Sequence, residues 1–250
     1  RYYEEDGIGY VVADNARINQ DVLIAPTAKG GVKHGQYAEV RITHWPTPSR
    51  QAQGEVIEVV GDYMAPGMEI EVALRSYDIP SEWPEAVLKE AALLKDHVVE
   101  KDKQKRVDLR HLPLVTIDGE DARDFDDAIY CEPHKASGWR LFSGGWKLYV
   151  AIADVSHYVP LGSALDEEAE LRGTSVYFPS QVIPMLPEEL SNGLCSLNPH
   201  VDRLAMVCEM TVSKSGELTD FEVYEAVIHS HARLTYNKVS SMLEHPRSRE

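Results

Sequence analysis

Six acidic side chains crowd into ten residues near the middle of the sequence. They are Asp118, Glu120, Asp121, Asp124, Asp126 and Asp127, with Arg123 as the single basic residue among them. Two carboxylates about 4 Å apart repel each other by about 4 kcal/mol at an effective dielectric constant near 20. Such groups splay into water, take up protons or hold a cation. Carboxylate oxygens suit Mg²⁺ or Mn²⁺, and two such ions promote in-line attack on a phosphodiester.

Other acidic motifs compete with a two-metal site. An EF-hand counted from Asp118 needs a glycine at its sixth position and a glutamate at its twelfth, where Arg123 and Ile129 stand. A phosphatase of the DxD type needs an apolar strand directly before Asp124, but Ala122 and Arg123 precede it. A solvated acidic loop is the default interpretation of a charge run. The pattern alone therefore leaves a metal site and a solvated loop open.

The composition indicates a soluble globular protein. Apolar residues make up 43% of the 250 residues and charged residues 26%, which excludes disordered, collagen-like and disulfide-scaffold chains. Three cysteines without a CxxC pair favour a reducing, cytoplasmic compartment. No apolar stretch approaches the roughly 18 residues of a membrane span, so we expect no membrane contact. The net charge of −16 argues against a basic nucleic-acid coat but is compatible with a metal-dependent nuclease.

The first 65 residues predict a small β-barrel. Four β-rich stretches are separated by turn signals, at residues 8–12, 21–25, 37–43 and 54–60. Short strands at this spacing are typical of a barrel such as the OB-fold. Seven aromatic and basic side chains of this part are candidates for a face on which RNA bases stack. Several of the aromatic ones could instead fill the interior of the barrel. The seven are Tyr10, Lys29, Lys33, His34, Tyr37, Arg41 and Trp45.

Residues 66–110 predict a helical connector. Pro66 and Pro84 each stand where a first-turn proline belongs, and apolar residues follow each of them at three- and four-residue spacing. The charge-dense stretch over residues 100–106 is expected to be a solvated linker.

From residue 111 the pattern becomes that of an α+β domain. Strands are expected over 114–117, 125–130, 147–155, 204–212 and 218–224. A long loop that contains Gly138, Gly144 and Gly145 should join the second and third of these strands. Helices are expected over 165–172, closed by Gly173, and after a capping Thr235. Because apolar strands flank the acidic run on both sides, we expect it to be held at the edge of a core.

The run over residues 118–128 resembles the signature of the ribonuclease II/ribonuclease R family of exoribonucleases. Three further stretches fit in order, at residues 150–156, 172–179 and 183–197. The resemblance covers essentially the whole chain. It implies an α+β protein with an N-terminal OB/cold-shock-like barrel over residues 1–65, a helical connector over 66–110 and the first part of a ribonuclease II-type catalytic domain over 111–250.

The resemblance also implies an activity. Members of the family hydrolyse RNA processively from 3′ to 5′ and release nucleoside 5′-monophosphates, which implies single-stranded RNA with a free 3′ end as the partner of a monomeric enzyme. The four family carboxylates fall on Asp118, Asp124, Asp126 and Asp127. The first and last would chiefly hold Mg²⁺ or Mn²⁺, and the two between would complete the metal site and catalysis. Tyr177 falls on an aromatic residue that stacks on a base near the RNA 3′ end.

Departures from the family keep an alternative open. The loop over residues 132–146 is longer than we expect, and the family's downstream arginine, glutamate, second aromatic clamp and basic tail are not in the sequence. We therefore expect a fragment of a longer chain, with a non-catalytic RNA-binding module as the alternative function. By pattern alone, Tyr177 between two apolar residues is a core residue. Asp154 is either a turn cap or a support for the site, and three histidines are expected to be structural: His157, His229 and His231.

Overall fold

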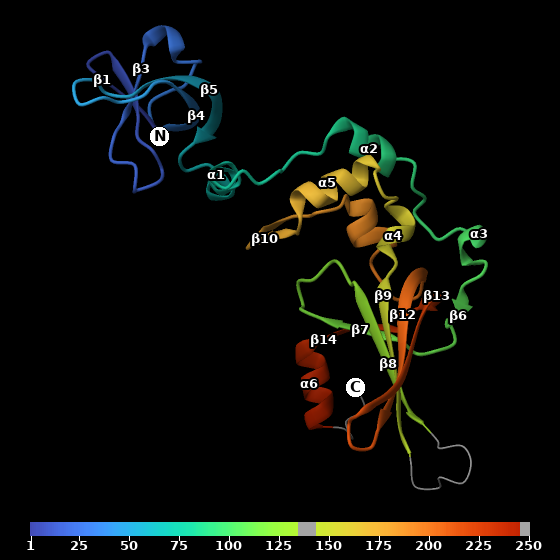
Figure 1. Cartoon of the computed structure of the whole chain (residues 1–250). Helices are drawn as coiled ribbons and strands as arrows, with labels where there is room; N and C mark the ends of the chain where they lie inside the picture. Colours follow the sequence, from blue (N-terminus) through green and yellow to red (C-terminus); the bar gives the residue numbers. More distant parts are fainter. Residues whose placement is uncertain (135–143, 246–250) are drawn as a thin grey trace. The chain divides into compact units, whose positions relative to one another are not determined.

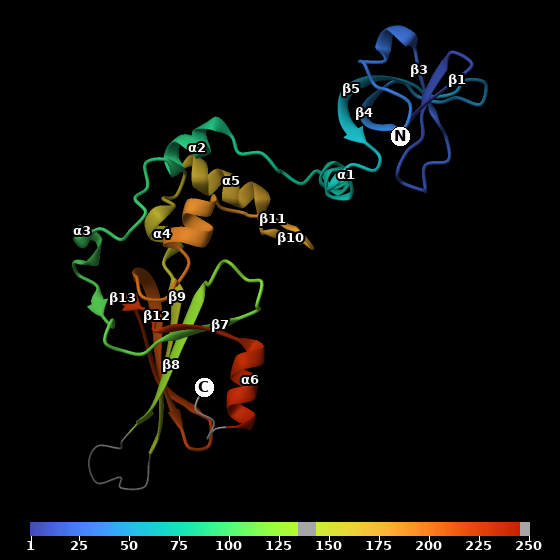
Figure 2. The same cartoon turned by 180° about the vertical axis from the view of Figure 1, so that it is seen from behind.

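The computed structural model describes residues 1–134 and 144–245. The chain forms two compact units, residues 1–81 and residues 82–250. Figures 1 and 2 show the elements of each unit from opposite sides. Part of the long loop expected after residue 132, including Gly138, falls outside the described residues.

The first unit is a five-stranded β-sheet that curls back on itself. Its strands are β1 (Tyr2–Glu5), β2 (Ile8–Val11), β3 (Val22–Ile24), β4 (Gln36–His44) and β5 (Gln53–Asp62), in the order β1-β2-β3-β5-β4. The first and last strands of this order lie side by side, and the Gly35 N–H donates to the Tyr2 carbonyl at 2.8 Å. A short 3₁₀-helix, η1 (Pro26–Ala28), follows β3. The predicted N-terminal barrel is confirmed, and β1 is a strand that the sequence analysis missed.

Burial of Tyr2 explains why this short first strand forms. Tyr2 is 2% exposed and packs in one core with Val11, Ile24 and Val32. The side chain of one aromatic residue thus fixes a strand whose remaining residues are mostly exposed. Burying an aromatic side chain of this size is one of the largest single hydrophobic contributions available to a small domain.

The predicted connector is shared between the two units. Helix α1 (Met68–Ser76) belongs to the first unit and begins after Gly67, whose φ of 82° suits a residue without a side chain. Helices α2 (Glu85–Ala91) and α3 (Glu100–Lys103) belong to the second unit. The predicted domain boundaries at residues 65 and 110 stay a prediction. The two units separate after residue 81 by compactness, which does not test where one functional domain ends and the next begins.

The second unit is built on a seven-stranded mixed sheet. The strands are β6 (Val107–Asp108), β7 (Val115–Asp118), β8 (Asp127–His134), β9 (Gly145–Ala153), β12 (Asp202–Ser213), β13 (Leu218–His229) and β14 (Ala232–Thr235). Their order is β14-β7-β8-β9-β12-β13-β6. Adjacent strands among the five inner ones run antiparallel, whereas each edge strand runs parallel to the inner strand beside it. The predicted α+β fold is confirmed.

Helices pack against this sheet at one of its ends and enclose its core. Besides α2 they are α4 (Val155–Tyr158), α5 (Ala164–Arg172) and the π-helix η2 (Glu189–Leu194), all grouped at one end of the sheet in Figures 1 and 2. Small strand residues such as Ala128 and Ala151 are fully buried against helix residues such as Leu165 and Leu190. Ser163 caps α5, and Gly173 ends it with a φ of 70°. The predicted helix is therefore confirmed, with its last residue at Arg172.

Two smaller elements complete the second unit. The two-stranded hairpin of β10 (Val176–Phe178) and β11 (Gln181–Ile183) was not expected from the sequence. Helix α6 (Tyr236–Glu244) lies beside β14 and β7, and the Thr235 side chain accepts a hydrogen bond from the Lys238 N–H at 3.3 Å. The capping role predicted for Thr235 is confirmed. No helix among the described residues is long and apolar enough to span a membrane.

The expectation of a solvated linker over residues 100–106 holds for its exposed residues but is wrong for Lys103 and Arg106. Lys103 Nζ lies 2.6 Å from Asp202 Oδ2, and Arg106 Nη2 lies 2.6 Å from Asp154 Oδ2. The Arg106 and Asp154 side chains are only 5% and 4% exposed. Charged side chains are buried in this way only when they are paired, so these two ion pairs attach the stretch to β12 and to the turn after β9.

Candidate active site

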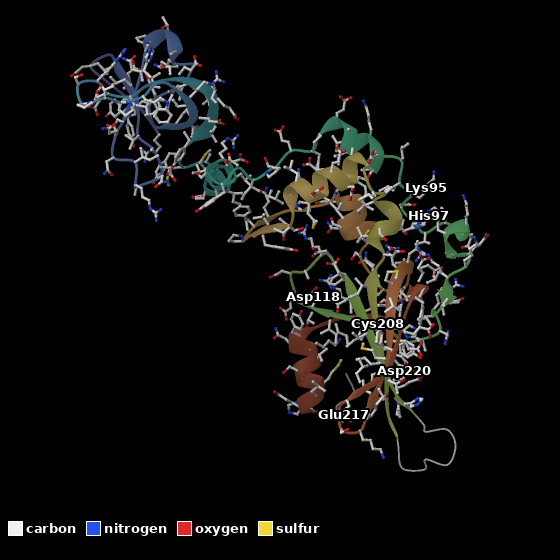
Figure 3. The ribbon with its side chains drawn as sticks, viewed as in Figure 1. Lys95, His97, Asp118, Cys208, Glu217 and Asp220 are labelled. Atoms are coloured by element: carbon white, nitrogen blue, oxygen red, sulfur yellow. The ribbon has the colours of Figure 1, made fainter. Side chains whose placement is uncertain are left out.

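The acidic residues lie on the turn between two strands of the large sheet. Asp118 is the last residue of β7, Asp127 is the first residue of β8, and residues 119–126 connect them. Figure 3 labels Asp118 where β7 ends, close to the start of α6. Phe125 is 2% exposed and ties the loop to the interior, between the buried Thr116 and Ala128 of the two strands. The expectation that the loop is held at the edge of a core is confirmed.

Of the four carboxylates assigned from the family resemblance, Asp126 is influenced electrostatically by the other three. Withdrawal of the Asp126 carboxyl from water raises its pKa above the usual value, although the residue keeps contact with solvent. The negative charges of the other three raise this pKa further, in the order Asp124, Asp127 and Asp118. A bound proton, or a cation in its place, therefore reduces both the cost of burying the Asp126 charge and its repulsion by the neighbouring carboxylates.

Hydrogen bonds hold two of these carboxylates. Asp118 Oδ1 accepts the Gly119 N–H at 2.7 Å. Asp124 Oδ2 accepts the Tyr177 hydroxyl at 2.9 Å, across 53 residues of sequence. Glu120, which is not one of the four, accepts from Asn237 Nδ2 of α6 at 3.0 Å. The loop thus has one part that faces the hairpin and another that faces α6.

The donors fit a hard divalent cation by their chemistry. Four carboxylates on one short turn offer only oxygen atoms, which are the ligands that Mg²⁺ and Mn²⁺ prefer. Among residues 1–134 and 144–245, however, no three or more acidic, histidine or cysteine side chains converge as a ready coordination shell. Binding a cation would require the side chains to rotate on their backbone positions. The metal assignment for Asp118, Asp124, Asp126 and Asp127 therefore stays a prediction.

Tyr177 is a surface residue. It is 63% exposed on the small hairpin, which excludes the alternative that it fills the core. Partial burial of its hydroxyl is the largest cause that raises its pKa, and the bond to the Asp124 carboxylate adds to it. The neutral hydroxyl is thereby kept as a donor to Asp124. The assigned role of the ring in base stacking stays a prediction.

The remaining candidates make structural contacts. Asp154 accepts from Arg106 and, at 2.8 Å, from the Ser156 hydroxyl. Burial alone would raise the pKa of Asp154, but these two partners outweigh it and lower the pKa below its usual value. His157 pairs with Asp102 at 3.2 Å, and His229 with Asp202 at 3.0 Å, in keeping with the structural interpretation of both histidines.

The proposed stacking face of the barrel is only partly available. Tyr10 stacks on Tyr3 with ring centroids 5.7 Å apart. Lys29 and Arg41 are paired with Glu4 and Glu55, respectively. Trp45 is 76% exposed and so does not fill the barrel. An RNA-binding face over Tyr10, Lys29, Lys33, His34, Tyr37, Arg41 and Trp45 stays a prediction.

Sequence reasoning missed two side chains that hold the acidic loop. They are Ser196, which is fully buried, and Arg233 of β14. Ser196 falls in one of the stretches that resemble the family, but no spacing rule links either residue to a loop more than 70 positions away. Only the folded chain brings them together.

Comparison with known proteins gives the same two parts. The family model of the RNB domain matches residues 106–250, and that of the cold shock domain matches residues 10–84. Ribonuclease R of Vibrio parahaemolyticus is 59% identical over 244 residues, which are 98% of this chain and 28% of that protein. The chain therefore spans less than a third of the length of this relative.

Solved structures agree with the sequence comparison. Mycoplasma genitalium RNase R in complex with double-stranded RNA is similar with a TM-score of 0.88 and 30% identity, over all of this chain and 43% of that chain. The same protein in complex with ribose methylated single-stranded RNA gives a TM-score of 0.87 at 30% identity, over all of this chain and 38% of that one. The resemblance inferred from the acidic run is confirmed, and the chain belongs to the family of proteins that carry the RNB domain.

Proposed function

We propose that the complete protein is a metal-dependent exoribonuclease that degrades RNA from 3′ to 5′ and releases nucleoside 5′-monophosphates. The single observation that carries this proposal is the acidic loop of an RNB domain, which places four carboxylates on one short turn between β7 and β8. Carboxylates that repel one another at the edge of a core are stabilised by a nearby counter-charge, such as a divalent cation. The relatives named ribonuclease R support RNA as the substrate.

Each group of this chain would have a defined part in the reaction. The carboxylates of Asp118, Asp124, Asp126 and Asp127 would hold the cation, which we propose to be Mg²⁺ with Mn²⁺ as a substitute. When bound, it would supply the positive charge that in-line attack of water on a phosphodiester requires. The exposed ring of Tyr177 would stack on a base near the 3′ end, which is sequence-tolerant because every base has a π-face.

Two further properties belong to the proposal. Single-stranded RNA with a free 3′ hydroxyl would be the partner, and a monomer would suffice, because all the proposed site residues come from one unit of one chain. A cytoplasmic location agrees with three free cysteines, of which Cys195 is buried.

Digestion of end-labelled RNA tests the proposal. Single-stranded RNA with a 5′ label is incubated with the complete protein and Mg²⁺, beside the same RNA with a blocked 3′ end and a sample in EDTA. We expect nucleoside 5′-monophosphates and a shortened labelled product only when both the free 3′ end and Mg²⁺ are present. Tight RNA binding without any degradation would instead support the non-catalytic RNA-binding module, and internal cleavage of the blocked RNA would also contradict the proposal.

A further inference from the structure

The acidic loop carries few backbone hydrogen bonds of its own. Within residues 119–126, the Ala122 N–H bonds to the Gly119 carbonyl at 3.3 Å, and the remaining anchors come from elsewhere in the fold. Six acidic side chains over residues 118–127 repel one another. A loop of this kind keeps one conformation only if groups outside the loop fix its backbone. These anchors therefore determine the backbone positions from which the carboxylate side chains extend.

Ser196 is the first anchor. Its side chain is completely buried, and its Oγ accepts the Phe125 N–H at 3.1 Å while lying 3.5 Å from the Arg123 carbonyl oxygen, to which it donates. The next residue, Leu197, donates its N–H to the Phe125 carbonyl at 2.7 Å. Both polar backbone groups of Phe125 are thus satisfied, at the residue that separates Asp124 from Asp126.

A second buried residue holds Ser196 itself. Arg203 is 6% exposed, and its Nε donates to the Ser196 carbonyl at 2.8 Å. The anchor therefore stands on β12 of the large sheet rather than on another loop. Buried polar groups that satisfy one another in this way fix a single arrangement, because an unpaired alternative is costly.

Arg233 is the second anchor and reaches the other half of the loop. Its Nη2 donates to the Ala122 carbonyl at 2.7 Å and to the Glu120 carbonyl at 3.3 Å. Its guanidinium carbon lies 4.2 Å from the centroid of the Phe125 ring. A planar guanidinium can stack on a ring and donate in its own plane at once, which the ammonium of a lysine does not reproduce.

We propose that Arg233 and Ser196 are positioning residues that hold the backbone of the acidic loop so that its carboxylates can share a divalent cation. This inference rests on the proposed function and assigns neither residue to the reacting atoms. The two anchors meet at Phe125, where Ser196 binds the backbone and Arg233 covers the ring. Losing either one would loosen the backbone between Asp124 and Asp126, although Tyr177 still bonds the Asp124 carboxylate and Ala153 still bonds the Asp126 carbonyl.

The charge of Arg233 provides a way to separate positioning from electrostatics. A positive charge beside a cation site weakens cation binding by repulsion, so its removal alone would strengthen binding. A positioning residue has the opposite effect, because its removal disorders the ligands. Arg233→Met removes the charge and both hydrogen bonds of Nη2, whereas Arg233→Lys keeps the charge and removes the planar group that stacks on Phe125.

Titration of the complete protein with Mn²⁺ in a calorimeter tests the inference. We expect Arg233→Met, Arg233→Lys and Ser196→Ala each to weaken Mn²⁺ binding about tenfold or more, as for other residues that orient ligands of a metal. RNA affinity in EDTA should stay unchanged, and the Mn²⁺ concentration needed for half-maximal rate should rise. Arg110→Lys is the matched control, because Arg110 pairs with Asp108 and Asp202 rather than with the loop.

The outcomes separate this inference from the proposed function. Wild-type affinity for Mn²⁺ in Arg233→Lys and Ser196→Ala, or tighter binding in Arg233→Met, overturns the positioning role while the proposed function stands. If Ser196→Ala proves unstable, the two Arg233 variants still decide. A wild-type protein that binds no Mn²⁺, or that binds it equally well after Asp126→Asn, overturns the proposed function and this inference together.

Discussion

Replacement of Tyr177 by phenylalanine or alanine separates the contribution of its ring from that of its hydroxyl. Tyr177→Phe removes only the donor to Asp124 Oδ2, whereas Tyr177→Ala removes the ring as well. Truncation of a buried aromatic residue costs about 3–5 kcal/mol, but Tyr177 is 63% exposed. We therefore expect either variant to lower the free energy of unfolding by about 1 kcal/mol or less.

The effect on RNA should be larger than the effect on stability. Stacking of one base on an aromatic ring contributes about 1–3 kcal/mol, which corresponds to about 5- to 150-fold in affinity. We expect Tyr177→Ala to lose this amount and Tyr177→Phe to keep it. The assay is fluorescence anisotropy with a short single-stranded RNA in EDTA, beside a gel of the limit products and a thermal melt of each variant.

A matched control and two outcomes make the experiment decisive. Tyr77→Ala removes a tyrosine that is 78% exposed on the first unit, outside the acidic site, and should leave the limit product unchanged. If Tyr177→Ala binds RNA as the wild type does and gives the normal limit product, the stacking role is refuted. A drop in unfolding free energy near 3–5 kcal/mol would refute the surface placement instead.

Three further variants test other parts of the account by thermal melting. Asp154→Asn takes the nearer carboxylate from the buried Arg106 and leaves it only the exposed Glu225 at 3.7 Å, so we expect a loss of up to about 3–5 kcal/mol and a melting temperature lower by up to about 6–20 °C. Because the folded pKa of Asp154 lies below its unfolded value, this pair stabilises the protein at neutral pH, and its contribution should disappear as the pH falls below the usual carboxyl range. Asp126→Asn should raise the stability of the metal-free protein at pH 7 by up to about 1 kcal/mol, since the raised pKa means that the charged form is disfavoured and the site is partly solvated. Gly54→Ala should destabilise the first unit by about 1–3 kcal/mol, because a Cβ there would lie 2.6 Å from Val40 Cγ1 and lead to overpacking.

The elements that the sequence predicted well are those with a long apolar repeat or a clear cap. The strand around Cys208 alternates over nine residues, and the helix before Gly173 has a clear stop signal, so both were expected at nearly their final positions. The strand at Tyr2 has only four residues, and the hairpin strand at Tyr177 has only three. Such segments are too short for periodicity to distinguish them from loops.

Long-range pairing explains the other differences. The charges of Lys103 and Arg106 looked solvated because their partners lie 99 and 48 residues away. Tyr177 looked buried because its neighbours are apolar, yet its two-stranded hairpin leaves this side chain exposed. The acidic loop was found from its motif, whereas the directions of its carboxylates depend on side-chain rotations and on anchors such as Arg233, which local sequence does not encode.

Single-turnover kinetics of Asp126→Asn in the complete protein test the central claim most directly. The variant keeps the shape of the side chain but removes a carboxylate from the acidic loop, and Asp121→Asn makes the same change at a loop residue outside the four. We predict that Asp126→Asn slows release of nucleoside 5′-monophosphate by about 100-fold or more while RNA affinity stays the same or improves, and that Asp121→Asn changes neither quantity. Equal rates in the wild type and Asp126→Asn, or parallel losses of RNA binding and turnover, would contradict it.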